Sequence, residues 1–217
     1  MGIGRREFLK FVGMALAGTS IDPATRVFAQ GDYFVNQALG LGFIKPAGWM
    51  IEAFEDFSHI IEGTIYTDPK VQAAVAADSH KLVAVVSKYG SASKAGYPER
   101  FTPAVAIHVE SATDNEELGG LESLVRDAEV LFQRILEDFE MLQNVEALSI
   151  SKCRAYRFKA RFLFRHRKLE PMPVDMVFYV IDAANGRHYT VQGMDSPYIG
   201  EGAQRELDRF FSSLRLV

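Results

Sequence analysis

The feature that most constrains this fold is a regular alternation of side-chain type over Ala155–Lys168 (AYRFKARFLFRHRK). Neighbouring side chains of a strand point to opposite faces, so this pattern predicts a strand with one buried and one solvated face. We expect it to be the central strand of an antiparallel sheet, with helices packed on its aromatic face. From Arg157 to Arg167, Leu163 is the one residue on the basic face that is not basic. The apolar set is Tyr156, Phe158, Ala160, Phe162 and Phe164, and the basic set is Arg157, Lys159, Arg161, Arg165 and Arg167.

The chain is long enough to build one sizeable hydrophobic core, because 48% of its 217 residues are hydrophobic. No shift in composition marks a second domain. The single cysteine, Cys153, excludes an internal disulfide and any zinc site built on several cysteines. No apolar run reaches about 18 residues, so the sequence predicts no transmembrane segment.

The N-terminus resembles a twin-arginine export signal. Arg5 and Arg6 are followed by Glu7-Phe8-Leu9-Lys10, then by a short apolar segment, and the small-x-small pattern of a cleavage site ends at Ala29. We therefore expect Met1–Ala29 to be a signal peptide and the mature protein to be periplasmic or otherwise exported, and soluble after cleavage. The alternative is a chance pair of arginines ahead of a buried helix.

Removal of this signal changes the charge balance of the chain. It takes four basic and two acidic residues from totals of 24 and 28, which leaves a net charge of about −6. A net acidic exported domain has no general reason to bind nucleic acid.

Several kinds of element are expected before the aromatic strand. Gln30–Leu41 is interpreted as a mobile lead-in with a short helical turn. The turn chemistry of Pro46 and Gly48 should place Trp49, the only tryptophan, on the sheet. Met50–Ile61 fits a helix and a strand alike. The remaining expected elements are a short helix from Asp68 to about Ala77, strands at Lys81–Tyr89 and Pro103–Glu110, a long amphipathic helix at Leu121–Leu142 and a strand at Val145–Ser151.

The part of the chain after the aromatic strand is predicted to be a hairpin and a helix. Leu169–Pro173 contains two prolines and is expected as a loop. Strands at Val174–Asp182 and Arg187–Met194 should be joined through Asn185-Gly186, a strong hairpin signal. A helix from about Glu201 closes the chain.

This order of elements resembles the PsbP/Mog1-like family, which includes DcrB-type exported proteins. The resemblance covers Gly42–Val217 and depends on the Pro-x-Gly-Trp turn, the long helix, the Asn-Gly hairpin and the ending Phe210-Phe211-Ser212-Ser213-Leu214. It implies a single α+β domain, an α/β/α sandwich around an antiparallel sheet, in a group largely without enzymes. Members of the group bind partners or small ligands. No metal ligand or contact residue of the family can be matched to a position here.

No motif in the sequence predicts a catalytic or cofactor-binding site. The histidines are scattered, and no nucleophile elbow or phosphate-binding loop is present. Glu52, Glu55 and Asp56 would lie one turn apart on a helix and could then bind a divalent ion, although a solvated face explains them as well. Cys153 lies between two cations, which favours the thiolate, but no base accompanies it. The five histidines are His59, His80, His108, His166 and His188.

The basic face of the aromatic strand is the one site hypothesis that the sequence offers. Its five cations, named above, either pair with carboxylates on neighbouring elements or form an exposed strip for an anionic partner or membrane surface. Candidate internal partners are the acidic residues of Glu122–Glu140 and Asp182. We expect internal pairing. The predicted function is a non-catalytic exported binding or accessory protein with an unidentified partner or small ligand. The alternative is an exported hydrolase or metal-dependent enzyme whose site is assembled from dispersed residues.

Overall fold

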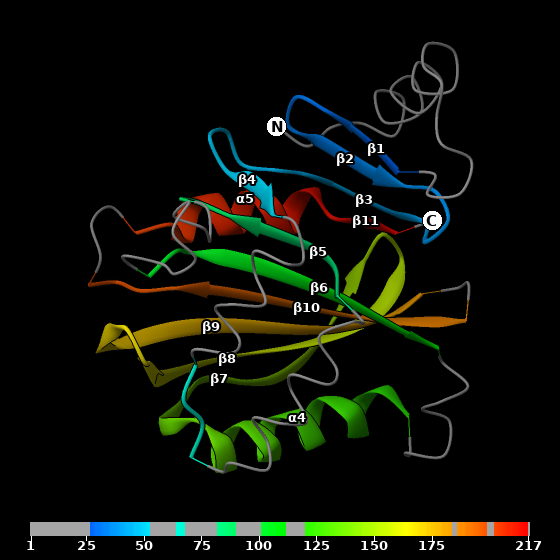
Figure 1. Ribbon diagram of the computed structural model, residues 1–217. Helices are drawn as coiled ribbons and strands as arrows, with labels where there is room; N and C mark the ends of the chain where they lie inside the picture. Colours follow the sequence, from blue (N-terminus) through cyan, green and yellow to red (C-terminus); the bar gives the residue numbers. More distant parts are fainter. Residues whose placement is uncertain are drawn as a thin grey trace.

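A large antiparallel sheet is flanked by one helix on one face and by a second helix and a small sheet on the other (Figure 1). The computed structural model describes residues 27–52, 64–67, 82–89, 101–111, 120–183, 186–198 and 202–216. Within these residues the large sheet has the order β4-β5-β6-β10-β9-β8-β7, and the small sheet has the order β1-β2-β3-β11. The strands of the large sheet are β4 (Met50–Glu52), β5 (Leu82–Ser87), β6 (Ala104–Ser111), β7 (Glu137–Ile150), β8 (Cys153–His166), β9 (Leu169–Ala183) and β10 (Arg187–Asp195). Those of the small sheet are β1 (Val27–Gln30), β2 (Tyr33–Asn36), β3 (Leu41–Ile44) and β11 (Arg215–Leu216).

Helix α4 (Leu121–Ile135) covers the aromatic face of β8 and β9. Phe132 of the helix makes edge contacts with Phe158 and Phe178, with ring centroids 6.2 and 5.3 Å apart. Phe158 is fully buried. The burial of the alternate positions of β8 therefore confirms the one-sided strand that the sequence predicts.

Helix α5 (Gln204–Ser213) packs on the opposite face of the large sheet and beneath the small sheet (Figure 1). Phe210, fully buried, lies 4.9 Å from the ring of Phe43 on β3 and 5.6 Å from that of Phe211. Trp49 is buried in the same core, as its turn predicted. Its backbone N–H donates to the carbonyl of Pro46, and Gly48 supplies the positive φ that this turn requires.

Strand β8 is not the central strand of the sheet, as expected from the sequence, but the second from one edge, between β9 and the edge strand β7. Nor do both helices lie on its aromatic face, because α5 packs on the other side. An alternation of apolar and polar residues indicates only that one face of a strand is solvated. A strand near the edge of a sheet can have one solvated face just as a central strand can.

The predicted helix over Leu121–Leu142 is too long, because α4 ends at Ile135 and β7 begins at Glu137. The apolar positions of 135–142 fit both periods, since Phe139 and Met141 alternate as a strand requires while Ile135 and Phe139 are one helical turn apart. Pairing with β8 selects the strand. The predicted strand over Val145–Ser151 is thus the second half of a longer one.

The predicted loop at Leu169–Pro173 is also wrong, because these residues begin strand β9. Pairing of β9 with β10 starts only at Asp175, so the first residues of β9 have one partner strand, β8, among the described residues. Proline has no N–H to donate, and it is tolerated at such a position because there is no second neighbouring strand to which that N–H would have to donate.

The stretch Gln30–Leu41 contains a strand rather than being a lead-in, because Tyr33–Asn36 form β2 and pair with β3. It does contain a turn, at residues 37–40, where the Gly40 N–H donates to the Gln37 carbonyl. Met50–Ile61, left open by the sequence, begins as strand β4. The expected short helix from Asp68 and the loop between β5 and β6 lie outside the described residues. The predicted strands around Leu82, Ala104, Val174 and Arg187 are confirmed.

Candidate functional site

The described part of the chain contains a groove of about 430 Å³ between the C-terminal end of α5 and strands β7–β9. Its apolar lining comes from Leu148 and Ile150 on β7, Tyr179 on β9, and Phe211 and Leu214 at the end of α5. A volume of this size is within the range of small-molecule sites. The polar lining residues are Ser149, Ser151, Arg157, Asp208, Ser212 and Arg215.

Arg157 is held at the groove by the neighbouring strands on both sides. It lies opposite Glu146 on β7 and Tyr179 on β9. Its Nε donates to the Glu146 carboxylate, and its Nη1 donates to the Tyr179 hydroxyl at 3.2 Å. Because cross-strand neighbours fix two of its nitrogens, the guanidinium has one defined orientation.

The floor of the groove is an aromatic pair. The rings of Tyr179 and Phe211 stack with centroids 4.6 Å apart and an interplanar angle of 29°. Gly193 on β10 makes this position of Phe211 possible, because a Cβ there would lie 2.9 Å from the Phe211 ring. Because position 193 has no side chain, the Phe211 ring can lie against the sheet. A larger residue at position 193 would push the ring into the groove.

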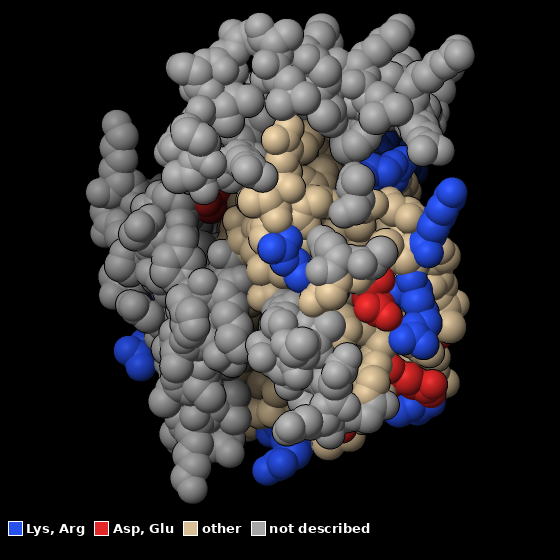
Figure 2. Space-filling view, turned by 90° about the vertical axis from the view of Figure 1, so that its right-hand side faces the viewer, with Lys and Arg blue, Asp and Glu red and all other residues tan. Residues whose placement is uncertain are grey.

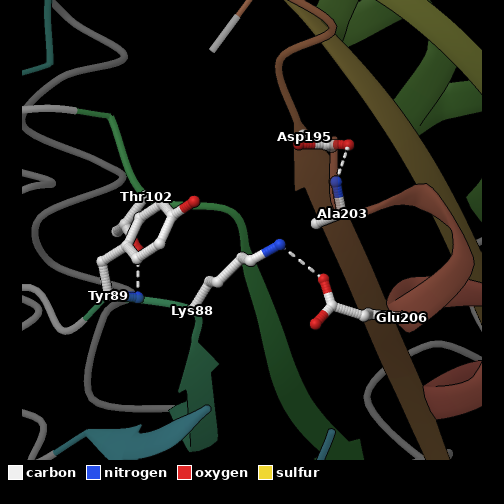
Figure 3. A network of polar contacts seen from close by, with 6 residues as sticks. All are labelled: Lys88, Tyr89, Thr102, Asp195, Ala203 and Glu206. Atoms are coloured by element: carbon white, nitrogen blue, oxygen red, sulfur yellow. Dashed lines mark hydrogen bonds and ion pairs between the residues drawn. The ribbon is translucent and has the colours of Figure 1, made fainter. Parts of the chain in front are cut away.

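A polar network anchors the N-terminal end of α5, the helix that carries Phe211 (Figure 3). Lys88, which follows β5, pairs with Glu206 at 2.6 Å, and the pKa of Lys88 is raised by that hydrogen bond. The buried Asp195 carboxylate accepts the Ala203 N–H at 2.7 Å. A carboxylate at a helix N-terminus satisfies an otherwise unpaired donor and is stabilised by the helix dipole.

Burial raises the pKa of Asp195 above the usual aspartate value. The folded state therefore binds this proton more tightly than the unfolded state. The stability of the wild type relative to Asp195→Asn should fall as pH rises from about 4 through the raised pKa. Urea denaturation of both proteins at pH 4 and pH 7 measures this difference. A difference that stays constant or grows with pH would contradict the assignment.

The basic residues of β8 do not form an uncompensated strip. Arg161 pairs bidentately with Asp175, at 2.6 and 3.0 Å, and Arg165 pairs with Glu137, with an Nη2 to Oε1 distance of 2.7 Å. Each of these hydrogen bonds raises the pKa of its arginine, and the pKa of Glu137 is lowered by Arg165. Three of the five cations of the basic face, Arg157, Arg161 and Arg165, therefore pair with carboxylates on neighbouring strands, as expected.

The structure corrects the expected partners of these arginines. Glu137 lies in the range that the sequence suggested, but Glu146 and Asp175 were not foreseen, and Asp182 pairs with Arg154 instead. Lys159 faces Gln143 and Val177 across the sheet. Arg167 is exposed in the β8–β9 turn. Figure 2 shows basic and acidic side chains interspersed along its right-hand edge.

The other residues considered from the sequence do not assemble into a metal or nucleophile site in the described part of the chain. No group of three His, Cys, Asp or Glu side chains there could hold a metal ion. His108 and His188 lie on the adjacent strands β6 and β10, and His188 Nε2 lies 3.5 Å from Asp182 Oδ1. His166 ends β8, where its Nδ1 accepts the Lys168 N–H at 3.2 Å.

The paired-carboxylate hypothesis is wrong for Glu52, which lies on strand β4 rather than on a helix and accepts a hydrogen bond from Ser87. Glu55, Asp56, His59 and His80 lie outside the described residues. Cys153 opens β8, half-buried, with its Sγ 4.0 Å from the Ser151 carbonyl.

The predicted signal peptide falls almost entirely outside the described residues, including Arg5 and Arg6. Ala29, at the predicted cleavage point, lies in β1 opposite Phe34. No helix in the described ranges is long and apolar enough to cross a membrane.

Comparisons with known proteins concern the fold of this chain. No protein-family model and no curated protein matches the chain. The solution structure of cyanobacterial PsbP (CyanoP) from Synechocystis sp. PCC 6803 matches with a TM-score of 0.52 and 12% identity, over 92% of this chain and 96% of that one. A crystal structure from Bacteroides thetaiotaomicron VPI-5482 matches with a TM-score of 0.45 and 10% identity, over 87% of this chain and 49% of that one.

These observations define the class of protein. The chain is an α+β protein of mostly antiparallel sheets, and its fold is PsbP-like. At 12% identity the likeness to cyanobacterial PsbP concerns the fold alone.

Proposed function

We propose that this protein is an exported, non-catalytic binding protein that holds a small ligand in the groove between α5 and β7–β9. The groove is the observation that supports this proposal, because it combines an aromatic floor with a guanidinium of fixed orientation. Concave sites that combine apolar surface with a few oriented polar groups are typical of small-molecule binding. We also propose that the large sheet and its two helices form the α/β/α sandwich of the PsbP/Mog1-like group.

Native mass spectrometry of the mature protein, purified from the compartment to which its own cell exports it, tests this function. We expect the wild type to retain a small organic molecule. Ser212→Trp should lose that molecule, because Ser212 lies exposed at the groove and an indole there would fill it. Arg209→Trp is the matched control, since Arg209 is exposed on the same helix but outside the groove.

Two results would contradict the proposed function. If Ser212→Trp retains the same molecule as the wild type, the ligand binds elsewhere. If the wild type instead carries a stoichiometric metal ion and no organic molecule, the metal-dependent enzyme becomes the better explanation.

Export by the twin-arginine pathway is part of this proposal. Replacing Arg5 and Arg6 with lysines should leave the precursor uncleaved in the cytoplasm, because the pathway's receptor reads the arginine pair. Cell fractionation with an antibody to the mature domain measures the effect. The conservative control is Lys10→Arg, which should be exported and cleaved. Normal export of the double lysine variant would rule out this route.

A further inference from the structure

The groove carries positive charge at two places on its lining, and both arginines retain donors for a ligand. Arg157 uses Nε and Nη1 for Glu146 and Tyr179, while its Nη2 makes no hydrogen bond to the described residues. An arginine has five N–H donors in a planar fork, so two anchored nitrogens still leave part of the fork available.

Arg215, on β11 just after α5, also keeps donors available. Its Nη1 donates to the carbonyls of Ser212 and Leu214, at 2.9 and 2.7 Å, and its Nε and Nη2 make no hydrogen bond to the described residues. The last carbonyls of a helix carry partial negative charge, which would repel an anion. Because Arg215 donates to two carbonyls in this region, it offsets that repulsion where a ligand would lie.

The acidic groups near the groove are already engaged. Glu146 accepts from Arg157, and Asp208 Oδ1 accepts from Gln204 Nε2 at 2.9 Å on the same helix. The groove lining therefore contains two guanidiniums and one carboxylate. With Glu146 counted, the charges around the groove balance, so the preference for an anionic ligand comes from the unused N–H donors of the two guanidiniums.

The lining also has an apolar part, which favours a ligand with an apolar body. The stacked rings of Tyr179 and Phe211 present a flat floor, and Leu148 and Ile150 pack against the same core. A small inorganic anion would leave this surface exposed to water, whereas an aromatic or aliphatic body would cover it.

We infer that the groove binds a small organic carboxylate, with its anionic group on Arg157 and Arg215 and its apolar body on the Tyr179–Phe211 pair. This inference depends on the proposed function, because it names the ligand class of the same groove. A carboxylate matches the planar fork of arginine, and such charge-assisted hydrogen bonds are stronger than neutral ones.

Isothermal titration calorimetry of the mature protein at low ionic strength tests the ligand class. The probes are 4-phenylbutyrate, its neutral analogue 4-phenylbutan-1-ol, and acetate. We expect 4-phenylbutyrate to bind at least about tenfold more tightly than the alcohol, since a charged hydrogen bond contributes about one such factor. Acetate should bind more weakly than 4-phenylbutyrate, because it lacks the apolar body. Equal affinity for the acid and the alcohol, or no binding of the acid, would overturn the inference.

The chain offers a closely matched pair of variants. Arg157 and Arg161 lie four residues apart on the same face of β8, and both pair with a carboxylate of an adjacent strand, but only Arg157 lines the groove. Arg157→Gln should weaken 4-phenylbutyrate binding about tenfold or more, and Arg161→Gln should leave it unchanged. Arg215→Gln, on the opposite element, should weaken binding in the same direction and is a second test if Arg157→Gln unfolds.

The outcomes separate the ligand class from the function itself. If Arg157→Gln and Arg215→Gln both bind 4-phenylbutyrate as the wild type does, the anion assignment is wrong. If the molecule retained from the cell is neutral and is lost in Ser212→Trp, the proposed binding function is supported, but the inference that the ligand is a carboxylate is wrong. If Ser212→Trp binds every ligand as the wild type does, both proposals fail.

Discussion

Phe158→Ala should lower the free energy of unfolding by about 3–5 kcal/mol. Phe158 is fully buried under α4, and its ring lies 5.2 Å from that of Phe178 and 6.2 Å from that of Phe132. The substitution removes apolar contacts and leaves a cavity that the surrounding strands cannot fill without moving. Such a loss is a large share of the roughly 5–15 kcal/mol that stabilises a typical domain.

Urea denaturation measures this loss, and Lys159→Ala is the control. Lys159 is the next residue on β8 and points to the opposite, partly solvated face, so its truncation should cost less than about 1 kcal/mol. Losses of equal size for the two variants would mean that burial does not alternate along β8.

Phe210→Ala should cost a similar amount, about 3–5 kcal/mol, but should loosen a different part of the molecule. Phe210 joins α5 to β3 through Phe43, and the Ile44 N–H donates to Ser213 Oγ at 2.9 Å nearby. The variant should therefore expose the amides of β2 and β3 to hydrogen exchange more than those of β8 and β9.

The exposed neighbour Arg209 provides the control for this prediction. Arg209→Ala should change neither stability nor exchange by a large amount, because the side chain is exposed on α5. Equal acceleration of exchange in both sheets of Phe210→Ala would mean that the two faces of the fold unfold as one unit.

Local patterns in the sequence predicted the elements whose two faces differ in solvation. The alternation around Phe158 and the glycine before Arg187 were enough for β8 and for the β9–β10 hairpin, where Gly186 has a φ of 73°. The end of α4 was missed because the position of Phe139 fits both the helical and the strand period. Only the pairing of this segment with β8 decides between helix and strand. The small sheet was missed because its strands are four residues or fewer.

The candidate site could be predicted only in part. Arg157 stood out because it belongs to a basic series in an otherwise acidic chain. Tyr179, Phe211 and Arg215 carried no such signal, since each resembles a core or surface residue of its own element. Their convergence depends on the crossing of α5 over the large sheet, which brings Arg215 to the same groove as Tyr179, 36 positions earlier, and Arg157, 58 positions earlier. The internal partners of the β8 arginines likewise depend on strand register.

A crystal structure of the protein, purified with the molecule it retains from the cell, shows whether a small ligand occupies the groove. We expect electron density between α5 and β7–β9, with an apolar body against Tyr179 and Phe211 and an anionic group against Arg157. Density for that molecule at any other place, with this groove empty, would contradict this expectation.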